Sequence, residues 1–393
     1  MSPNLGQRIA DWFETHWITP AYSGWLAGGL SIFFFAAATN TMAGWLYVIS
    51  GVMFALLAIA AILPERSLRQ IRVTRHAIEP ISAGESLVVE VVLENQTNQP
   101  KTLLQVQDVI PYVLGQPISK SIEMIPAQQS YHWIYEHPTQ RRGVFRWQTL
   151  QLRTATPLGL FWCRRSQTVK ATAIVYPTVL PLSQCPLIDE MGRDINANVQ
   201  SAYRAQGATE GVTRTLRPYR WGDSIRLIHW RTSARYGELR VRELETFTGG
   251  QEIIIGLDTE MRDRSLAGEN SWEPDQFEQA VIAAASLYFY AAHHNLQVSV
   301  WTAATGVVKG KQVVLETLAA THAAEERKAE RLPETPLLWL TQDTDSLTAL
   351  PEGSRWILWR SPHTALPDVG VQSQRGLILQ ADQSLQIQLQ TPI

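Results

Sequence analysis

MAGWLYVISGVMFALLAIAAIL, residues Met42–Leu63, contains no charged side chain. As a helix, a run of this length is long enough to cross a hydrocarbon core of about 30 Å. A shorter apolar run, Gly24–Thr39 (GWLAGGLSIFFFAAAT), precedes it, and Asn40-Thr41 forms a polar break with turn character. Because backbone groups in lipid must be satisfied internally, we expect a transmembrane helical hairpin over residues 22–64. A signal peptide and a buried hairpin of a soluble protein are the alternatives.

Positive charges flank the predicted hairpin on one side. Arg8 precedes it and the connecting turn has no Lys or Arg, whereas four arginines follow it: Arg66, Arg69, Arg72 and Arg75. The positive-inside rule then predicts an integral protein of the inner (plasma) membrane with both termini in the cytoplasm. Residues 1–21 would be a cytoplasmic leader, in which Gln7–Trp17 has the amphipathic pattern of a helix lying in the interface. A frayed, partly ordered leader is the alternative.

Length and composition exclude several classes of protein. The chain has 393 residues, too many for one ordinary hydrophobic core, and a formal net charge of −2. A dedicated nucleic-acid binder normally carries a strong basic excess, so we expect no nucleic-acid partner. The two cysteines, Cys163 and Cys185, make neither a disulfide framework nor a zinc spacing, and they fit a reducing compartment.

Residues 70–181 have a strand-like pattern. Short runs rich in β-branched and aromatic residues alternate imperfectly and are separated by Gly, Pro, Asn and Gln breaks. They are Val88–Asn95, Thr102–Ile110, Ser130–His137, Gly143–Thr154 and Ala171–Pro177. No long helical period interrupts them, so we expect a β-sandwich-like domain of short antiparallel strands.

The pattern changes over residues 184–393. Apolar strands alternate with helical periods, of which Asp275–His294 is the longest and Lys311–His322 another. The expected strands are Glu252–Asp258, Leu296–Ala303, Pro336–Thr341, Arg355–Arg360 and Gly376–Gln380. Such alternation indicates an α/β domain with a mostly parallel, doubly wound sheet. The charged run Ala324–Arg331 is expected to be a solvated helix face or a linker.

The segment Tyr219–Arg235, YRWGDSIRLIHWRTSAR, combines arginines with aromatic residues at unusual density. Asp223 suits the N-cap of a helix, and Gly237 suits its end. The strand-like run Glu238–Glu245 follows. We therefore expect a turn, a short helix from Asp223, and a strand leading into the α/β sheet.

This segment resembles the signature of the domain of unknown function 58 family. The signature spans residues 219–242 here. The matching residues are Tyr219, Gly222, Asp223, Arg226, Trp230, Ala234 and Arg235, and we count Arg231 with this signature. Arg142-Gly143 and the turn Thr156–Phe161 (TPLGLF) resemble two further family motifs, an Arg-Gly strand and an Asp-Pro-Phe-Gly-Leu-type turn. Trp221 departs from a usual proline, and Thr156 departs from a usual aspartate.

The resemblance implies a membrane-anchored protein with a β-rich domain followed by a von Willebrand factor A-like domain. Members of the family are often encoded with MoxR-type AAA+ ATPases and with other von Willebrand factor A proteins. The expected partners are therefore the lipid bilayer, an AAA+ ATPase and other von Willebrand factor A proteins, in assembly or chaperone-like work.

A von Willebrand factor A domain can hold Mg²⁺ through an Asp-x-Ser-x-Ser loop after its first strand. The corresponding loop here is Asp258-Thr259-Glu260-Met261-Arg262, in which only Asp258 is kept. A hard cation needs several well-placed oxygens, and Arg262 would bring a positive charge to the site. We therefore expect no cofactor, and Asp258 stays as the one candidate ligand for Mg²⁺, with Thr341-Gln342-Asp343 as a candidate second loop.

The arginines of the signature have two interpretations. They could bind phosphate or an acidic partner, because arginine forms bidentate bonds with both. Alternatively, they pair internally with Asp223, Glu243 or Glu245, since buried charges are normally paired. No nucleophile with an adjacent base and no phosphate-binding glycine motif occurs, so we assign no catalytic residue.

The leading hypothesis is accordingly a non-enzymatic, membrane-anchored interaction or scaffold protein. The alternative is a metal- or phosphate-dependent hydrolase or ligand-binding enzyme that uses Asp258 and the arginine cluster. A third hypothesis is an envelope scaffold whose hairpin oligomerises through the small residues Gly24, Gly28 and Gly29.

Overall fold

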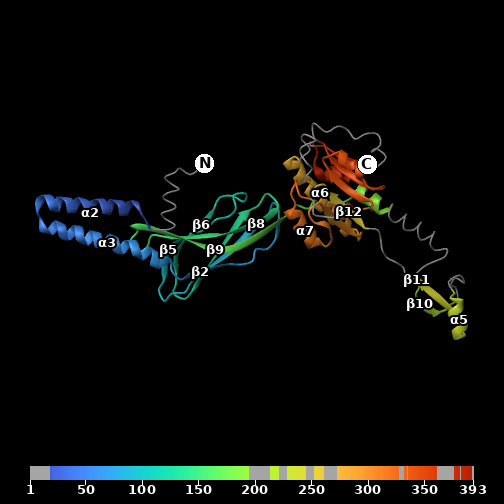
Figure 1. Ribbon diagram of the computed structural model, residues 1–393, viewed down its shortest axis with the longest axis horizontal. Helices are drawn as coiled ribbons and strands as arrows, with labels where there is room; N and C mark the ends of the chain where they lie inside the picture. Colours follow the sequence, from blue (N-terminus) through green and yellow to red (C-terminus); the bar gives the residue numbers. More distant parts are fainter. Residues whose placement is uncertain are drawn as a thin grey trace. The chain divides into compact units, whose positions relative to one another are not determined.

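The computed structural model has a mixed α and β architecture that divides into two compact units, Met1–Tyr176 and Pro177–Ile393 (Figure 1). The structure describes residues 18–193, 213–220, 228–244, 252–260, 272–326, 332–333, 335–360, 376–380 and 382–391, with the backbone alone at 213–217 and 242–244. The predicted leader helix Gln7–Trp17 lies outside these residues. Each unit is considered separately below.

Two long apolar helices, α2 (Tyr22–Thr41) and α3 (Gly44–Leu68), form the predicted hairpin. Both are long and apolar enough to cross a membrane, and most of their surface is exposed. Small residues lie where the helices meet: Ser31 Oγ donates a hydrogen bond to the Ser50 carbonyl at 3.3 Å. Close packing of this kind is usual between helices in lipid. The helices support membrane association, while the side on which the termini lie stays a prediction.

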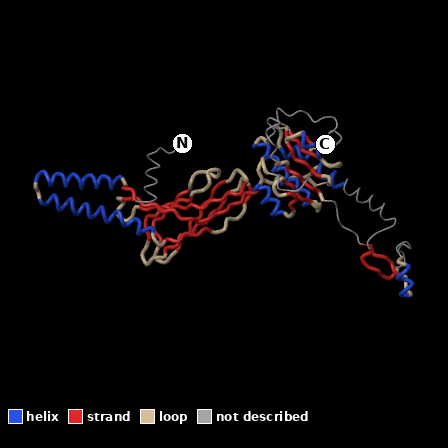
Figure 2. The backbone as a smooth tube through the Cα atoms, in the orientation of Figure 1, coloured by secondary structure: helices blue, strands red, loops and turns tan. Residues whose placement is uncertain are grey.

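Strands build the rest of the first unit (Figure 2). Neighbouring strands are antiparallel, except that β3 is parallel to β9. One sheet has the order β2-β4-β7, and the other has the order β1-β9-β8-β5-β6, with β3 beside β9. The three-stranded sheet consists of β2 (Ile71–Arg75), β4 (Ser86–Asn95) and β7 (Ser130–Pro138). The other sheet consists of β1 (Ile18–Pro20), β3 (Ile81–Ser82), β5 (Lys101–Asp108), β6 (Ile118–Ile125), β8 (Gly143–Thr154) and β9 (Phe161–Tyr176). Every second side chain along β4 is buried, as the period of a strand requires.

One hydrophobic core joins the two sheets of this unit. Leu87, Val89 and Val91 of β4 lie in the same cluster as Val106 of β5 and Leu152 of β8. The alternating pattern therefore buries one face of each sheet against the other, while the remaining faces are largely solvated.

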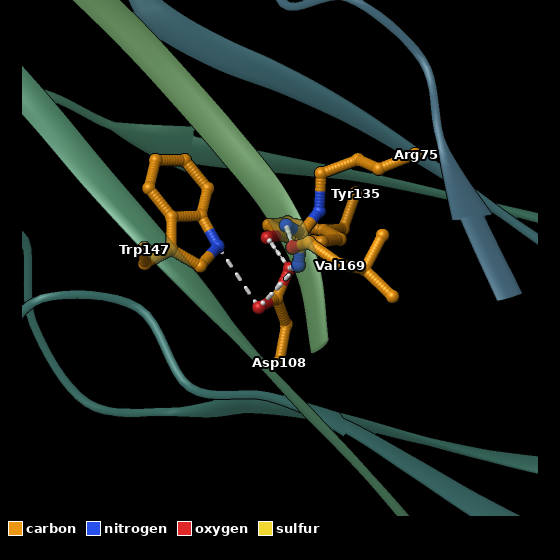
Figure 3. A network of polar contacts seen from close by, with 5 residues as sticks. All are labelled: Arg75, Asp108, Tyr135, Trp147 and Val169. Atoms are coloured by element: carbon orange, nitrogen blue, oxygen red, sulfur yellow. Dashed lines mark hydrogen bonds and ion pairs between the residues drawn. The ribbon is translucent and has the colours of Figure 1, made fainter. Parts of the chain in front are cut away.

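A buried polar network crosses this core (Figure 3). Asp108 of β5 and Arg75 of β2 form an ion pair at 2.8 Å, and their side chains are 0% and 1% exposed. Tyr135 donates its hydroxyl to Asp108 Oδ2 at 2.8 Å, and Trp147 donates Nε1 to Oδ1 at 2.9 Å. Arg75 also donates to the carbonyl of Val169. Because β2 and β7 belong to one sheet and β5 and β8 to the other, the network links the sheets.

The second unit contains a sheet of the order β14-β13-β12-β15-β16-β17. All neighbouring pairs are parallel except β13 with β14. Its strands are β12 (Ile253–Leu257), β13 (Val298–Thr302), β14 (Gly306–Val308), β15 (Leu337–Thr341), β16 (Arg355–Trp359) and β17 (Gly376–Leu379). Every residue of β12, β15 and β16 is buried, which explains their continuous apolar sequences.

Helices and a turn of 3₁₀ helix cover this sheet. They are α6 (Pro274–His293), α7 (Lys311–Ala320), η2 (Asp345–Ala349) and α8 (Leu385–Gln390). One cluster of buried side chains joins α6 to Ile255 of β12, and a second cluster joins Leu347 of η2 to Ile254. Since Ile254 and Ile255 face opposite ways, both faces of the sheet are packed, as expected for a parallel sheet.

Candidate functional sites

The signature segment folds into a small antiparallel ribbon with one helix. Strand β10 (Thr213–Pro218) pairs with β11 (Arg240–Leu244), and α5 (Trp230–Tyr236) precedes β11. The expected strand is present as β11, and it precedes β12, a strand of the α/β sheet, in the chain. Among the described residues, β11 pairs with β10 in a two-stranded sheet of its own.

The helix begins later than the sequence predicts. Ile228 lies in an isolated antiparallel bridge with Val241, so the chain is extended at the position where a helix from Asp223 would continue. His229 is the N-cap instead: its Nδ1 accepts the Thr232 backbone N–H at 3.2 Å. Gly237 ends the helix at a φ of 72°, as predicted, because the left-handed region is open to glycine.

Five of the eight predicted signature residues can be placed. Trp230, Arg231, Ala234 and Arg235 are all exposed on α5. They form two adjacent pairs four residues apart, so the pairs lie on neighbouring turns of one short helix. Tyr219 is half-buried, and its backbone N–H donates to the Leu239 carbonyl at 2.9 Å.

The remaining three signature residues, Gly222, Asp223 and Arg226, lie outside the described residues. So does Glu245, and the side chain of Glu243 is not described either. The internal pairing of the arginines with these carboxylates therefore stays a prediction.

Large apolar side chains accompany the arginines on this module, which we define as β10, α5 and β11. Trp230 is 62% exposed, Tyr236 61% and Leu239 46%. Arg240 lies over the ring of Tyr236 at 4.7 Å, a distance typical of a cation–π contact. Exposed Trp and Arg side chains are the residues that most often dominate binding energy at interfaces.

A second candidate site lies at the carboxyl end of the parallel sheet. Asp258 follows β12 and is 7% exposed. Thr341, the last residue of β15, donates its hydroxyl to Asp258 Oδ2 at 2.7 Å. The Asp258 backbone is fixed as well, since its N–H donates to the Leu340 carbonyl at 3.0 Å and Trp272 Nε1 donates to its carbonyl at 2.6 Å. Asp258 is thus held rigidly at the edge of the sheet.

The sheet order explains why these residues meet. From β12 the chain passes through α6 to β13 on one side, and it returns to β15 on the other side of β12. The direction of winding therefore reverses between β12 and β15. Ligands of open α/β sheets bind at the carboxyl ends of the strands at such a reversal. Asp258 and Thr341 flank that point.

The rest of the loop predicted to hold a cation can be placed only in part. Thr259 uses its hydroxyl to accept the Ala303 backbone N–H at 3.0 Å. The backbone of Glu260 forms an isolated parallel β-bridge with Glu325. Met261 and Arg262 lie outside the described residues. Within the described part of the chain, no group of three or more His, Cys, Asp or Glu side chains could hold a metal.

The comparison with protein families covers the first site and Asp258 of the second. Residues 215–330 match the family described as "Protein of unknown function DUF58". The family recognised from the sequence is thereby confirmed. The DUF58 segment begins within β10, contains the exposed Trp230, β12 and Asp258, and continues past the end of α7. Thr341, the partner of Asp258, follows the segment.

Comparisons with individual proteins add little to this DUF58 assignment. No curated protein matches the chain. The CARDB domain of a Pyrococcus furiosus protein is 9% identical, with 26% of this chain and 93% of that chain covered at a TM-score of 0.18. A GH20 exo-β-N-acetylglucosaminidase from Vibrio harveyi is 8% identical, with 30% and 20% covered at 0.18. A β-glucosidase from Listeria innocua is 16% identical, with 25% and 16% covered at 0.15. Scores this low establish no shared fold.

Proposed function

We propose that this chain is a membrane-anchored interaction or scaffold protein that docks a partner through the module β10, α5 and β11. The exposure of Trp230 carries the proposal. A tryptophan that leaves 62% of its surface in solvent forgoes much of its burial energy, about 25 cal/mol per Å² of apolar surface. A partner that covers Trp230 would recover that energy.

The charges beside Trp230 define the kind of partner. Arg231 and Arg235 are exposed one turn apart on α5, and each guanidinium can bind a carboxylate through two parallel hydrogen bonds. A partner surface with an apolar pocket rimmed by Asp or Glu would fit. The family resemblance makes a MoxR-type AAA+ ATPase, or another von Willebrand factor A protein, the partner class to test, in assembly or chaperone-like work.

The finer fold assignments belong to the same proposal. The shared core of the two antiparallel sheets supports a β-sandwich-like domain that acts as a spacer. The parallel sheet with both faces covered supports a von Willebrand factor A-like domain. The two apolar helices, with arginines after the second, support an inner-membrane hairpin with both termini and both domains in the cytoplasm.

The docking proposal is tested by crosslinking in native membranes followed by mass spectrometry. Trp230→Ala and Arg235→Ala should each abolish the adduct to one specific partner while the protein stays folded and abundant. Tyr112→Ala is the matched control, because Tyr112 is an aromatic residue that is 95% exposed in the other unit. An unchanged adduct in the two α5 variants, or equal loss in the control, would refute docking through this module.

The alternative function, a metal- or phosphate-dependent hydrolase or ligand-binding enzyme, is favoured by one observation. Asp258 and Thr341 meet at the reversal of the sheet, where a ligand of the α/β domain would bind. Asp258→Asn keeps the size and a hydrogen-bonding oxygen but removes the charge. If Mg²⁺ or inorganic phosphate raises the thermal midpoint of the wild type and not of this variant, the enzyme hypothesis gains. An equal response of the two thermal midpoints would refute it.

The third hypothesis is hairpin oligomerisation through three glycines, and one of them, Gly24, is already packed against its own chain. A Cβ on Gly24 would lie 2.1 Å from the carbonyl oxygen of Leu160 in the same chain. Gly24 therefore packs within the protomer rather than on an exposed helix surface.

A further inference from the structure

The turn between β8 and β9 lies directly against the first turn of α2. The Ala21 backbone N–H donates to the Leu160 carbonyl at 2.8 Å, and Ser23 Oγ donates to the Gly159 carbonyl at 2.9 Å. The close approach requires Gly24, since any larger residue would meet the Leu160 carbonyl. The turn, residues 156–160, is the part of the sequence that resembles the family's Asp-Pro-Phe-Gly-Leu motif.

The last turn of α3 reaches the same place. Ser67 Oγ and Thr156 Oγ1 lie 3.2 Å apart, and Glu65 is 3.5 Å from Arg165 near the start of β9. Both ends of the hairpin that point toward the β-rich part of the unit are thus bonded to the β8–β9 turn. The hairpin and the turn form one rigid body rather than two parts joined by a linker.

Helix length fixes the depth of this turn. α2 has 20 residues, so it is about 30 Å long, equal to the thickness of the hydrocarbon core. Its first turn must then lie at the boundary between hydrocarbon and headgroups. Tyr22 and Trp25, which are 86% and 72% exposed there, are the aromatic residues typical of that layer. Gly159 is bonded to this helical turn and therefore lies at the same depth.

Leu158 is the neighbour of Gly159, about 3.8 Å away along the chain. It is 46% exposed. Two residues after the turn, Trp162 stacks under the guanidinium of Arg153 at 4.2 Å. An exposed leucine beside stacked tryptophan and arginine is the composition of a surface that enters the interface from the aqueous side.

We propose that the β8–β9 turn is a second membrane contact: Leu158 inserts into the interfacial layer, and Arg153 and Arg165 face the lipid phosphates. This inference rests on the proposed membrane anchoring and adds to it. The bonds between the hairpin and the turn set the orientation of the β-rich part, and an inserted turn would hold that orientation on the bilayer. Arginine suits the phosphates because its fork of donors matches their oxygens, even where Glu65 shares the charge of Arg165.

Site-specific labelling of the full chain tests the proposal. Both native cysteines are fully buried, so an exposed cysteine can be labelled selectively with a nitroxide. Leu158→Cys places the label on the turn. Val113→Cys is the matched control: Val113 is 65% exposed and lines a cavity with Phe145, near the start of β8. The 12 residues of β8 separate that point from the turn by about 40 Å.

Both variants are reconstituted into vesicles of phosphatidylcholine and phosphatidylglycerol, and collision rates are measured with oxygen and with a water-soluble nickel complex. We expect the oxygen-to-nickel ratio at residue 158 to exceed that at residue 113 several-fold. A photoactivatable phospholipid added to the wild-type chain provides a second measurement, with its adduct expected on the peptide that contains Leu158. Equal, water-like ratios and no adduct on that peptide would overturn the inference.

Alkaline extraction separates this failure from that of the anchoring proposal. If the chain resists extraction while the label at residue 158 is water-like, the hairpin spans the membrane and only the second contact is wrong. If the chain is extracted, the anchoring proposal fails and the second contact falls with it.

Discussion

Replacing Asp108 by Asn should strongly destabilise the β-rich unit. The substitution keeps the shape of the side chain and removes its negative charge. Arg75 then keeps a positive charge with 1% of its side chain exposed, and only the carbonyl of Val169 and the new amide oxygen remain to receive it. Tyr135 and Trp147 would compete with Arg75 for that same amide.

The expected cost follows from the geometry of the ion pair. Removing one partner of a buried salt bridge costs about 3–5 kcal/mol, because an uncompensated charge stays in the core. The pair is not an ideal fork, since one nitrogen, Arg75 Nη2, donates to both carboxylate oxygens and Arg75 Nε is buried without a partner. We therefore expect the lower half of the range, about 3–4 kcal/mol.

The two cysteines allow each unit to be assayed alone. Cys163 is fully buried in the core of the β-rich unit, and Cys185 is fully buried in the other unit. A thiol reagent reaches each of them only when its own unit opens. A loss of about 3–4 kcal/mol corresponds to a rise of two to three orders of magnitude in the labelling rate of Cys163, at about 1.4 kcal/mol per factor of ten. The labelling rate of Cys185 should not change.

A charge-free replacement serves as the control. In Arg75→Met combined with Asp108→Leu, both charges leave the core, and replacing a buried pair by apolar residues is often neutral. The hydroxyl of Tyr135 and the indole N–H of Trp147 then lose their acceptor, at about 1–3 kcal/mol each, so Tyr135→Phe is added to lower that cost. If Asp108→Asn alone leaves the Cys163 rate within about threefold of wild type, the argument from buried charge is wrong.

Two further predictions concern other contacts. Burial, together with the hydrogen bond to Asp189, raises the pKa of Tyr290 from 10.0 to about 12. The folded state thus keeps the Tyr290 proton to a higher pH than the unfolded state does. The contribution of Tyr290 to the free energy of unfolding should therefore be constant below about pH 10 and fall toward pH 12. Tyr290→Phe should flatten that fall when stability is measured by chemical denaturation, and an unchanged slope would contradict the assignment. Gly24→Ala should push α2 away from Leu160, which accepts the N–H of Ala21 at 2.8 Å, whereas Gly29→Ala meets nothing within 4 Å. We expect hydrogen exchange at Ala21 to accelerate about tenfold in the first variant and to stay unchanged in the second.

The sequence predicts those elements whose pattern depends on local burial. The alternation of Val88–Asn95 predicts a strand with one buried face, and β4 has it. The continuous apolar run Glu252–Asp258 predicts a strand buried on both faces, and β12 is one. The period of Asp275–His294 predicts the helix that became α6. Each of these segments is long and unmixed, so no competing contact overrides its preference.

Elements that depend on distant partners were not predictable. β6 is mostly exposed and has a polar sequence, so it is a strand because it pairs with β5, not because of its own pattern. The cap of α5 shows the same competition. Aspartate is a better N-cap than histidine, but Ile228 is held in a bridge with Val241, and α5 begins after His229. Likewise, Thr341 meets Asp258 across 83 residues because of the order of the strands.

The features that function would use differ physically from a structural residue such as Asp108. Asp108 is fully buried and accepts bonds from Arg75 and two neutral donors, so its charge is used inside the core. Trp230 leaves its ring exposed, and Leu158 leaves an apolar side chain exposed at a turn, so both cost free energy in the isolated chain. Asp258 is set apart by its position instead, because it lies with Thr341 where the winding of the sheet reverses. Exposure at the first two places and position at the third are the physical reasons to look there for a partner, a lipid and a ligand.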